Sequence, residues 1–170
     1  MIIEELYFAL PIYFANMMPV FVKNINILNY PINKNIFGEN KTIRGFLSAI
    51  FISIIIFYVQ YYLYKFYLIK KISLINYYEV NLLFLGFLAG FGAMLGDLIK
   101  SYFKRIRNIK PGHSWIPFDQ LDFIFGSLLF LYPFVNLTAI NVLTLLIFTP
   151  LLHIAANFIG YYIGLKDKKW

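Results

Sequence analysis

Five long runs of hydrophobic residues follow one another along the chain, and polar and charged residues gather in the segments between them. The runs cover residues 6–22, 46–64, 80–99, 121–140 and 141–164. Each is close to the roughly 20 apolar residues that a helix needs to cross a bilayer. We therefore expect an all-α integral membrane protein with five transmembrane helices. The last two would form a tight hairpin, and Pro150 would kink the fifth.

The positive charges are unevenly distributed between these runs. Segment 23–45 carries four Lys and Arg residues, segment 100–120 carries five and the tail carries three, whereas the opposite side would hold only Lys65, Lys70 and Lys71. Cytoplasmic loops of membrane proteins are enriched in Lys and Arg. The pattern therefore predicts a multi-pass protein of the cell membrane with its N-terminus outside and its C-terminus in the cytoplasm.

The composition narrows the class of protein further. A length of 170 residues suits a single domain, residues 1–170. Hydrophobic residues make up 61% and charged residues 14%, against about 45–50% and about 25% in soluble domains. A core of this size cannot hide so much apolar surface, which excludes a water-soluble globular enzyme, and a disordered chain is excluded as well. The absence of cysteine excludes a disulfide scaffold and a cysteine metal site.

The net charge of +7 would by itself suit a nucleic-acid partner. On so apolar a chain it favours a cytoplasmic membrane face and an anionic ligand instead, so we expect no nucleic acid to bind.

Three of the eight acidic residues, Asp97, Asp119 and Asp122, lie near the cytoplasmic ends of predicted helices. Asp119 and Asp122 are spaced i, i+3, which puts both carboxylates on one helix face. Ordinary roles exist for them, because Asp97 can pair with Lys100 and acids in a first turn complement the helix dipole. Three clustered carboxylates, however, repel one another unless a cation lies between them. Hard oxygen ligands suit Mg²⁺ or Ca²⁺, so we predict a divalent cation here.

Small residues recur in the third run, which contains Gly86-x-x-x-Gly90 and Gly92-x-x-x-Gly96. Such patterns allow two helices to pack closely. The packing can occur within one chain or between two, so the pattern is compatible with a homodimer. In either case it would bring Asp97 close to the backbone of a neighbouring helix.

Cations lie between the acids, and segment 100–110 holds five of them: Lys100, Lys104, Arg105, Arg107 and Lys110. A cytoplasmic loop explains these cations but not the acids on both sides of them. Transfer of a phosphate group uses a metal that bridges phosphate oxygens and cations that stabilise the leaving group. Segment 38–45 adds hydrogen-bond donors and glycine turns that would suit a nucleotide, although it lacks the Gly-x4-Gly-Lys spacing of a Walker loop.

These segments resemble the motifs of the CTP-dependent phosphatidate cytidylyltransferases, and most closely those of the shorter archaeal branch, the CDP-archaeol synthases. The similarity extends over nearly the whole chain. The matching segments are Asn16-x-x-Pro19-Val20, Lys41-Thr42-x-Arg44-Gly45, and Gly92-Ala-Met-Leu-Gly96-Asp97-Leu-x-Lys100-Ser101 continuing through Lys104-Arg105, Lys110-Pro-Gly and Pro117-Phe-Asp119-Gln-Leu-Asp122.

The resemblance implies a reaction of archaeal ether phospholipid biosynthesis on the cytoplasmic face of the membrane. The phosphate of 2,3-bis-O-(geranylgeranyl)-sn-glycerol 1-phosphate, an unsaturated archaetidic acid, would attack the α-phosphorus of CTP and give CDP-archaeol and pyrophosphate. Since this nucleophile is already an anion, no strong general base is required. The partners would be CTP, an isoprenoid ether-lipid phosphate and membrane lipids.

The resemblance also assigns roles to residues. Mg²⁺ on the triphosphate would be held by Asp97, Asp119 and Asp122. Catalytic cations that bind the phosphates would be Lys104, Arg105 and Lys110. The nucleotide would contact Asn40, Lys41, Thr42, Arg44, Lys100 and Ser101.

Two other classes can be compared with this interpretation. The CDP-alcohol phosphotransferases also use clustered aspartates at a membrane, but they need an Asp-Gly pair that this chain lacks. A small transporter or channel subunit would use Asp97, His153 and the Pro150 kink. A transport path needs polar groups at several depths, whereas here they gather at one membrane face.

Overall fold

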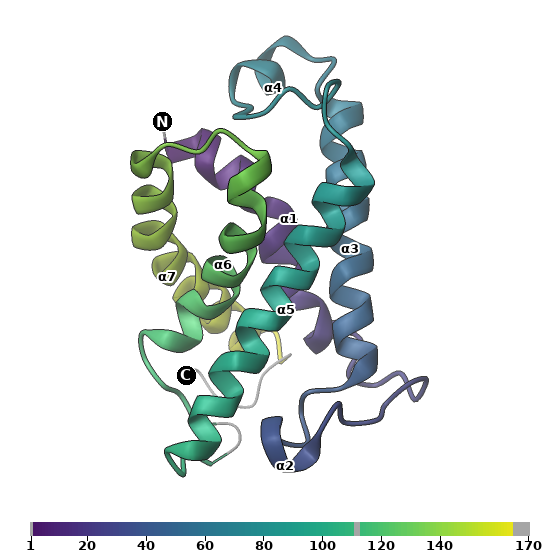
Figure 1. Cartoon of the computed structure of the whole chain (residues 1–170), viewed down its shortest axis with the longest axis vertical. Helices are drawn as coiled ribbons and strands as arrows, with labels where there is room; N and C mark the ends of the chain where they lie inside the picture. Colours follow the sequence, from purple (N-terminus) through teal and green to yellow (C-terminus); the bar gives the residue numbers. More distant parts are fainter. Residues whose placement is uncertain (1, 111–112, 165–170) are drawn as a thin grey trace.

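The computed structural model describes residues 2–110 and 113–164, and this part of the chain is helical and contains no β-strand. Its elements are α1 (Ile2–Phe21), α2 (Lys34–Phe37), α3 (Ile43–Leu63), α4 (Tyr67–Lys71), α5 (Leu82–Ile106), α6 (Phe118–Leu131), the 3₁₀ turn η1 (Tyr132–Phe134) and α7 (Ala139–Tyr162). Helix α5 runs through the middle of the bundle, with α3 on one side and α6 on the other (Figure 1). The all-α prediction is confirmed for the described residues.

Three of the described helices, α3, α5 and α7, are long and apolar enough to cross a membrane. Helices α3, α6 and α7 carry large apolar side chains on the outside of the bundle. Phe51 on α3 is 66% exposed, and Leu129 on α6 and Ile140 on α7 are each 73% exposed. An apolar surface of this extent is typical of a protein that contacts lipid. The five crossings and the sides on which the termini lie stay predictions.

The structure corrects two predicted boundaries. The fourth run was expected to continue to residue 140, but α6 ends at Leu131, and the chain is extended at Val135 after the turn that contains Pro133. Proline has no backbone N–H and stops the helix there. At ~1.5 Å per residue, the 14 residues of α6 span about 21 Å, which is less than the ~30 Å core of a bilayer.

The second correction concerns segment 100–120, which was expected to be a loop. Helix α5 continues through its first seven positions to Ile106, so Lys100 and Lys104 lie on the helix. No Gly or Pro interrupts this stretch before residue 111, and Lys and Arg are good helix formers.

Small residues let α5 touch both neighbouring helices. A methyl group added at Gly86 would lie 2.6 Å from the Cα atom of Ile54 on α3, and one added at Gly92 would lie 2.6 Å from the carbonyl oxygen of Gly126 on α6. At both places only glycine fits without displacing a backbone. The close packing predicted from the glycine pattern therefore occurs within one chain, and the homodimer stays a prediction.

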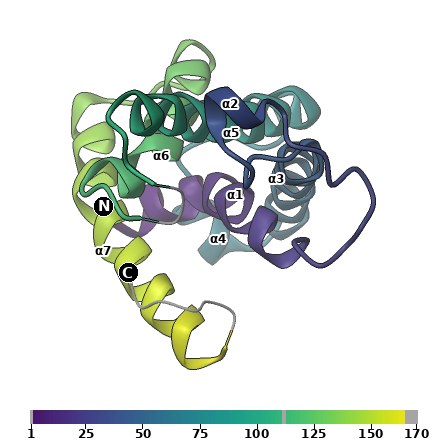
Figure 2. The same ribbon diagram turned by 90° about the horizontal axis from the view of Figure 1, so that it is seen from below.

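The loops gather at the two ends of the bundle. Helix α4 with Lys70 and Lys71 lies at one end, and α2, the segment before α3 and the segment after α5 lie at the other (Figure 1). The latter end holds the basic segments that were expected in the cytoplasm. Pro150 lies inside α7 without ending it, and Figure 2 shows the helix changing direction and its last turns leaving the bundle.

Candidate active site

Three carboxylates surround one lysine at the junction of α5 and α6. The Nζ atom of Lys100 lies 2.9 Å from Oδ1 of Asp97, 3.0 Å from Oδ1 of Asp119 and 2.9 Å from Oδ2 of Asp122. Asp97 and Lys100 come from α5, whereas Asp119 and Asp122 come from the first turns of α6. The structure thus brings together the three predicted acids, and the cation between them is an ammonium group. The pairing of Asp97 with Lys100, which the sequence offered as an alternative to a metal, is present.

Two further lysines flank this centre. Lys41 Nζ lies 2.5 Å from Oδ2 of Asp97, and Lys104 Nζ lies 3.0 Å from both carboxylate oxygens of Asp119. Three carboxylates therefore face three ammonium groups. The six side chains are mostly shielded from solvent, with exposed fractions between 5% and 26%. Because an unpaired buried charge is costly, the ion pairs between these carboxylates and ammonium groups are what makes their burial tolerable.

The cluster also bears on the predicted metal. In residues 2–110 and 113–164, no group of three or more Asp, Glu, His or Cys side chains is spaced to hold a metal ion directly. The Lys100 ammonium nevertheless has one carboxylate oxygen from each of Asp97, Asp119 and Asp122 within 2.9–3.0 Å. Carboxylate oxygens are the ligands that a hard divalent cation prefers, and these three point at one place. A metal ion could occupy that place only if the Lys100 side chain left it.

The segment after α5 folds back to fix the start of α6. Lys104 donates a hydrogen bond to the carbonyl oxygen of His113, and the backbone N–H of Trp115 donates to Asp119. The Arg107 guanidinium lies 5.1 Å from the centre of the Trp115 ring, in a cation–π arrangement. Sequence reasoning missed Trp115, because a backbone donor leaves no signal in the residue type.

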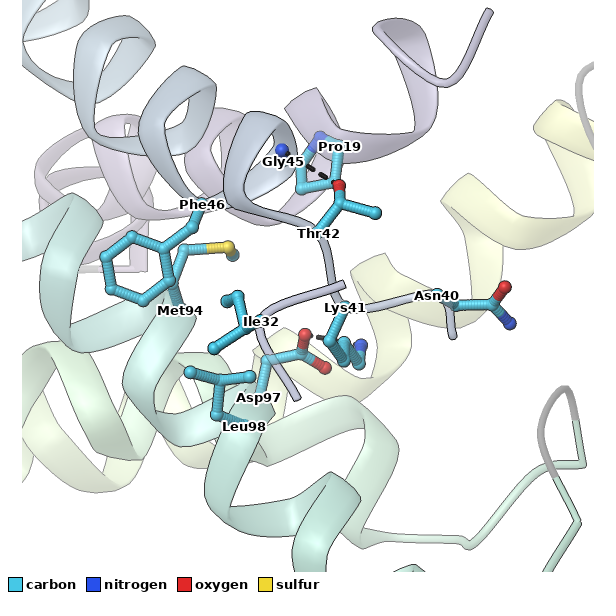
Figure 3. A pocket seen from close by; sticks show the side chains of 10 residues that line it. All are labelled: Pro19, Ile32, Asn40, Lys41, Thr42, Gly45, Phe46, Met94, Asp97 and Leu98. Atoms are coloured by element: carbon cyan, nitrogen blue, oxygen red, sulfur yellow. Dashed lines mark hydrogen bonds and ion pairs between the residues drawn. The ribbon is translucent and has the colours of Figure 1, made fainter. Parts of the chain in front are cut away.

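A small cleft that is open to solvent lies beside the cluster. It lies between the end of α1, the segment before α3, the start of α3 and the middle of α5. Figure 3 shows the Lys41–Asp97 ion pair at this cleft. The lining residues are Pro19, Ile32, Asn40, Lys41, Thr42, Gly45, Phe46, Met94, Asp97 and Leu98.

Two of the predicted nucleotide contacts have roles inside the protein. Thr42 caps α3, since its Oγ1 atom accepts a hydrogen bond of 3.2 Å from the backbone N–H of Gly45. Arg44 donates to the carbonyl oxygen of Ile25 and thereby fastens the long segment before α3. Gly45 packs closely against α1, since a methyl group there would lie 3.1 Å from Cβ of Pro19. Of this motif, Lys41 alone reaches the acidic cluster.

The other predicted residues lie around this centre. Ser101 is buried and donates a 2.7 Å hydrogen bond to the carbonyl oxygen of Asp97. The half-buried Arg105 approaches α2, with Nη1 3.9 Å from where a Cβ atom of Gly38 would lie. Asn40 and Lys110 are exposed. Pro111, Gly112 and the tail lysines 166, 168 and 169 lie outside the described residues.

Near Asn40, at α2, an exposed ion pair joins Lys34 and Glu39, whose charged atoms are 2.5 Å apart. The Lys34 ammonium holds the pKa of the Glu39 carboxyl below its ordinary value. Exposed pairs contribute little to stability.

Comparisons with known proteins agree on one family. A family model described as "CarS-like: CDP-archaeol synthase" matches residues 1–170. The chain is 36% identical to the CDP-archaeol synthase of Thermococcus gammatolerans, over 97% of this chain and 94% of that protein. It is 34% identical to that of Pyrococcus furiosus, over 99% and 98% of the two chains. A solved structure, described as an intramembrane enzyme for archaeal membrane lipid biosynthesis, is similar in fold, with a TM-score of 0.73 and 24% identity over 93% of this chain and 95% of that one.

Proposed function

The chain belongs to the CDP-archaeol synthase family, and on that basis we propose that it transfers the cytidylyl group of CTP to an ether-lipid phosphate. The acceptor is unsaturated archaetidic acid, and the products are CDP-archaeol and pyrophosphate. The enzyme is a multi-pass protein of the cell membrane, with its active site on the cytoplasmic face.

The observation that carries this proposal is the position of the charged cluster. Its three carboxylates and three lysines lie at the end of the bundle where the basic segments gather, and the cleft lined by Lys41 and Asp97 opens beside them. A water-soluble triphosphate and a membrane-held lipid phosphate can meet only near a membrane surface. Cations at that surface attract both anions.

The residues of the chain account for binding and for charge stabilisation. Lys104 and Arg105, on the last turns of α5, and Lys110 beyond them bind phosphate oxygens and stabilise the charge that develops on pyrophosphate as it leaves. Asn40 and Lys41 contact the nucleotide from the cleft. The lipid phosphate is the nucleophile, so its oxygen attacks the α-phosphorus without transfer of a proton to the protein.

A magnesium ion is part of the proposal. Asp97, Asp119 and Asp122 would hold it, and when bound it would supply charge neutralisation on the triphosphate. Thr42, Arg44 and Ser101 support this site through their hydrogen bonds to Gly45, Ile25 and Asp97.

The direct test uses detergent-purified protein with unsaturated archaetidic acid, Mg²⁺ and each nucleoside triphosphate in turn. We expect pyrophosphate release with CTP, and only when lipid and Mg²⁺ are both present. A folded sample that releases no pyrophosphate with any nucleotide would contradict the proposal.

A further inference from the structure

The place where a divalent cation would be held is filled by a side chain of the protein itself. Among residues 2–110 and 113–164, Lys100 alone contacts all three carboxylates of the cluster, at 2.9–3.0 Å. We propose that Lys100 is an internal counter-ion that the divalent cation must displace, and that this exchange makes tight metal binding depend on the nucleotide. The inference builds on the proposed function and adds a specific role for Lys100.

The ammonium and the metal exclude each other. Metal–oxygen distances of Mg²⁺ are about 2.0–2.1 Å, and the carboxylate oxygens that would provide them are those that now contact Lys100 Nζ. A metal ion among these oxygens would lie almost on top of the ammonium, and the two positive charges would repel strongly in a shielded site. The carboxylates can therefore serve Lys100 or the metal but not both.

Displacement leaves Lys100 in need of another anion. Its side chain is only 13% exposed, and a buried ammonium without a partner is costly. The other carboxylate contacts near it are already made, since Lys41 pairs with Asp97 and Lys104 with Asp119. A triphosphate brought into the site offers new oxygens to the displaced ammonium. Metal alone would leave Lys100 unpaired, whereas metal and nucleotide together would not.

Lys41 provides a matched control. It is a lysine of the same cluster with the same charge, but it contacts Asp97 from the side of the cleft and reaches neither Asp119 nor Asp122 among the described ion pairs. Lys41→Met and Lys100→Met remove the same charge and introduce the same side chain. Of these two variants, only Lys100→Met removes the ammonium group from between the three carboxylates.

The experiment measures Mn²⁺ binding to the detergent-purified full chain by electron paramagnetic resonance of free Mn²⁺, with and without CTP and without lipid. Protein-free samples at the same CTP concentration give the Mn²⁺ bound by CTP itself, which is subtracted. In the wild type we expect CTP to tighten Mn²⁺ binding by a factor in the range of about 5 to 150 that is typical of coupled sites. In Lys100→Met, Mn²⁺ should bind tightly without CTP, and the effect of CTP should shrink. Lys41→Met, which also removes a proposed nucleotide contact, should gain no affinity for Mn²⁺ in the absence of CTP. Lys100→Arg, which retains a positive charge, should not gain affinity for Mn²⁺ alone.

Several outcomes decide the matter. Equal Mn²⁺ affinity of wild type and folded Lys100→Met without CTP would overturn the inference, as would an equal gain in Lys41→Met. If Lys100→Met does not fold, thermal unfolding of the wild type tests the inference instead. Mn²⁺ alone should leave the Tm of the wild type unchanged, whereas Mn²⁺ with CTP should raise it. Stabilisation by Mn²⁺ alone, as large as with CTP, would overturn the inference. A third outcome is that Lys100→Met gains Mn²⁺ affinity but CTP changes Mn²⁺ binding in no variant. It would contradict the dependence of metal binding on the nucleotide, and with it the proposed function.

Discussion

Substituting Gly92 by alanine should separate the two halves of the charged cluster without touching any of its members. Gly92 faces α6, and a methyl group there would lie 2.6 Å from the carbonyl oxygen of Gly126 and 2.7 Å from the Cα atom of Ser127. Ordinary contacts begin at 3.4 Å, so α6 would have to move by about 0.8 Å. Both contacted atoms belong to the backbone, so no side chain can turn aside to make room.

This movement should affect stability and activity to different degrees. Overpacking of a core costs about 1–3 kcal/mol, which a folded protein can tolerate. A misplacement of about 1 Å near the chemistry can lower the rate about 100-fold. Asp119 and Asp122 lie on α6, whereas Asp97 and Lys100 lie on α5. A movement of α6 away from α5 therefore lengthens the distances between these two pairs of charged side chains. We therefore expect Gly92→Ala to remain folded and to lose on the order of 10- to 100-fold in kcat.

Gly86→Ala is the matched control. It lies on the same helix, and its added methyl group would be equally close, 2.6 Å, to a backbone atom, but on α3 rather than α6. It should lower Tm in detergent by a similar amount and leave the activity of the folded protein near the wild-type value. The assay is pyrophosphate release beside thermal unfolding for both variants. Equal losses of activity in the two variants would refute the reasoning that α5–α6 spacing sets the geometry of the site.

Three further outcomes are expected. Asp119→Asn removes the charge that faces Lys100 and Lys104, so it should abolish pyrophosphate release while the protein stays folded and membrane-inserted; full activity would contradict the role of this carboxylate. Phe57→Ala deletes a fully buried ring of α3 and should lower the free energy of unfolding by about 3–5 kcal/mol. Phe51→Ala, at a position 66% exposed on the same helix, should leave Tm in detergent nearly unchanged. Equal shifts of Tm in the two variants would show that the core lies elsewhere. Chelation of divalent cations by EDTA should stop turnover, and excess Mg²⁺ should restore it; undiminished turnover in EDTA would rule out a metal requirement.

The sequence predicted the helical architecture because apolar runs of about 20 residues leave few alternatives in a bilayer. The sequence did not predict the ends of α5 and α6, which depend on whether a proline or glycine interrupts the helix. Pro133 ended α6 early, and the uninterrupted stretch after Ile99 extended α5. Neither difference alters the apolar pattern from which the runs were derived.

The convergence of Asp97, Asp119 and Asp122 was predictable from spacing, since i, i+3 positions share a helix face and the glycines allow close packing. The partner that all three share was not predictable, because the sequence suggested Lys100 as a partner of Asp97 only. Lys100 was assigned to the nucleotide, and only the three-dimensional arrangement shows its Nζ atom among all three carboxylates. Likewise, the inward roles of Thr42 and Arg44 depend on the path of the segment before α3. Residue type alone does not reveal whether a donor serves a ligand or the fold.

In the proposed reaction, the cytidylyl group, with the α-phosphorus of CTP, becomes attached to the lipid. The most direct measurement incubates the purified protein with unsaturated archaetidic acid, Mg²⁺ and CTP that carries ³²P at either the α or the γ position, followed by extraction into organic solvent. We expect label from the α position to enter the lipid phase and label from the γ position to stay in water as pyrophosphate. Label from the γ position in the lipid, or no label from either position, would contradict it.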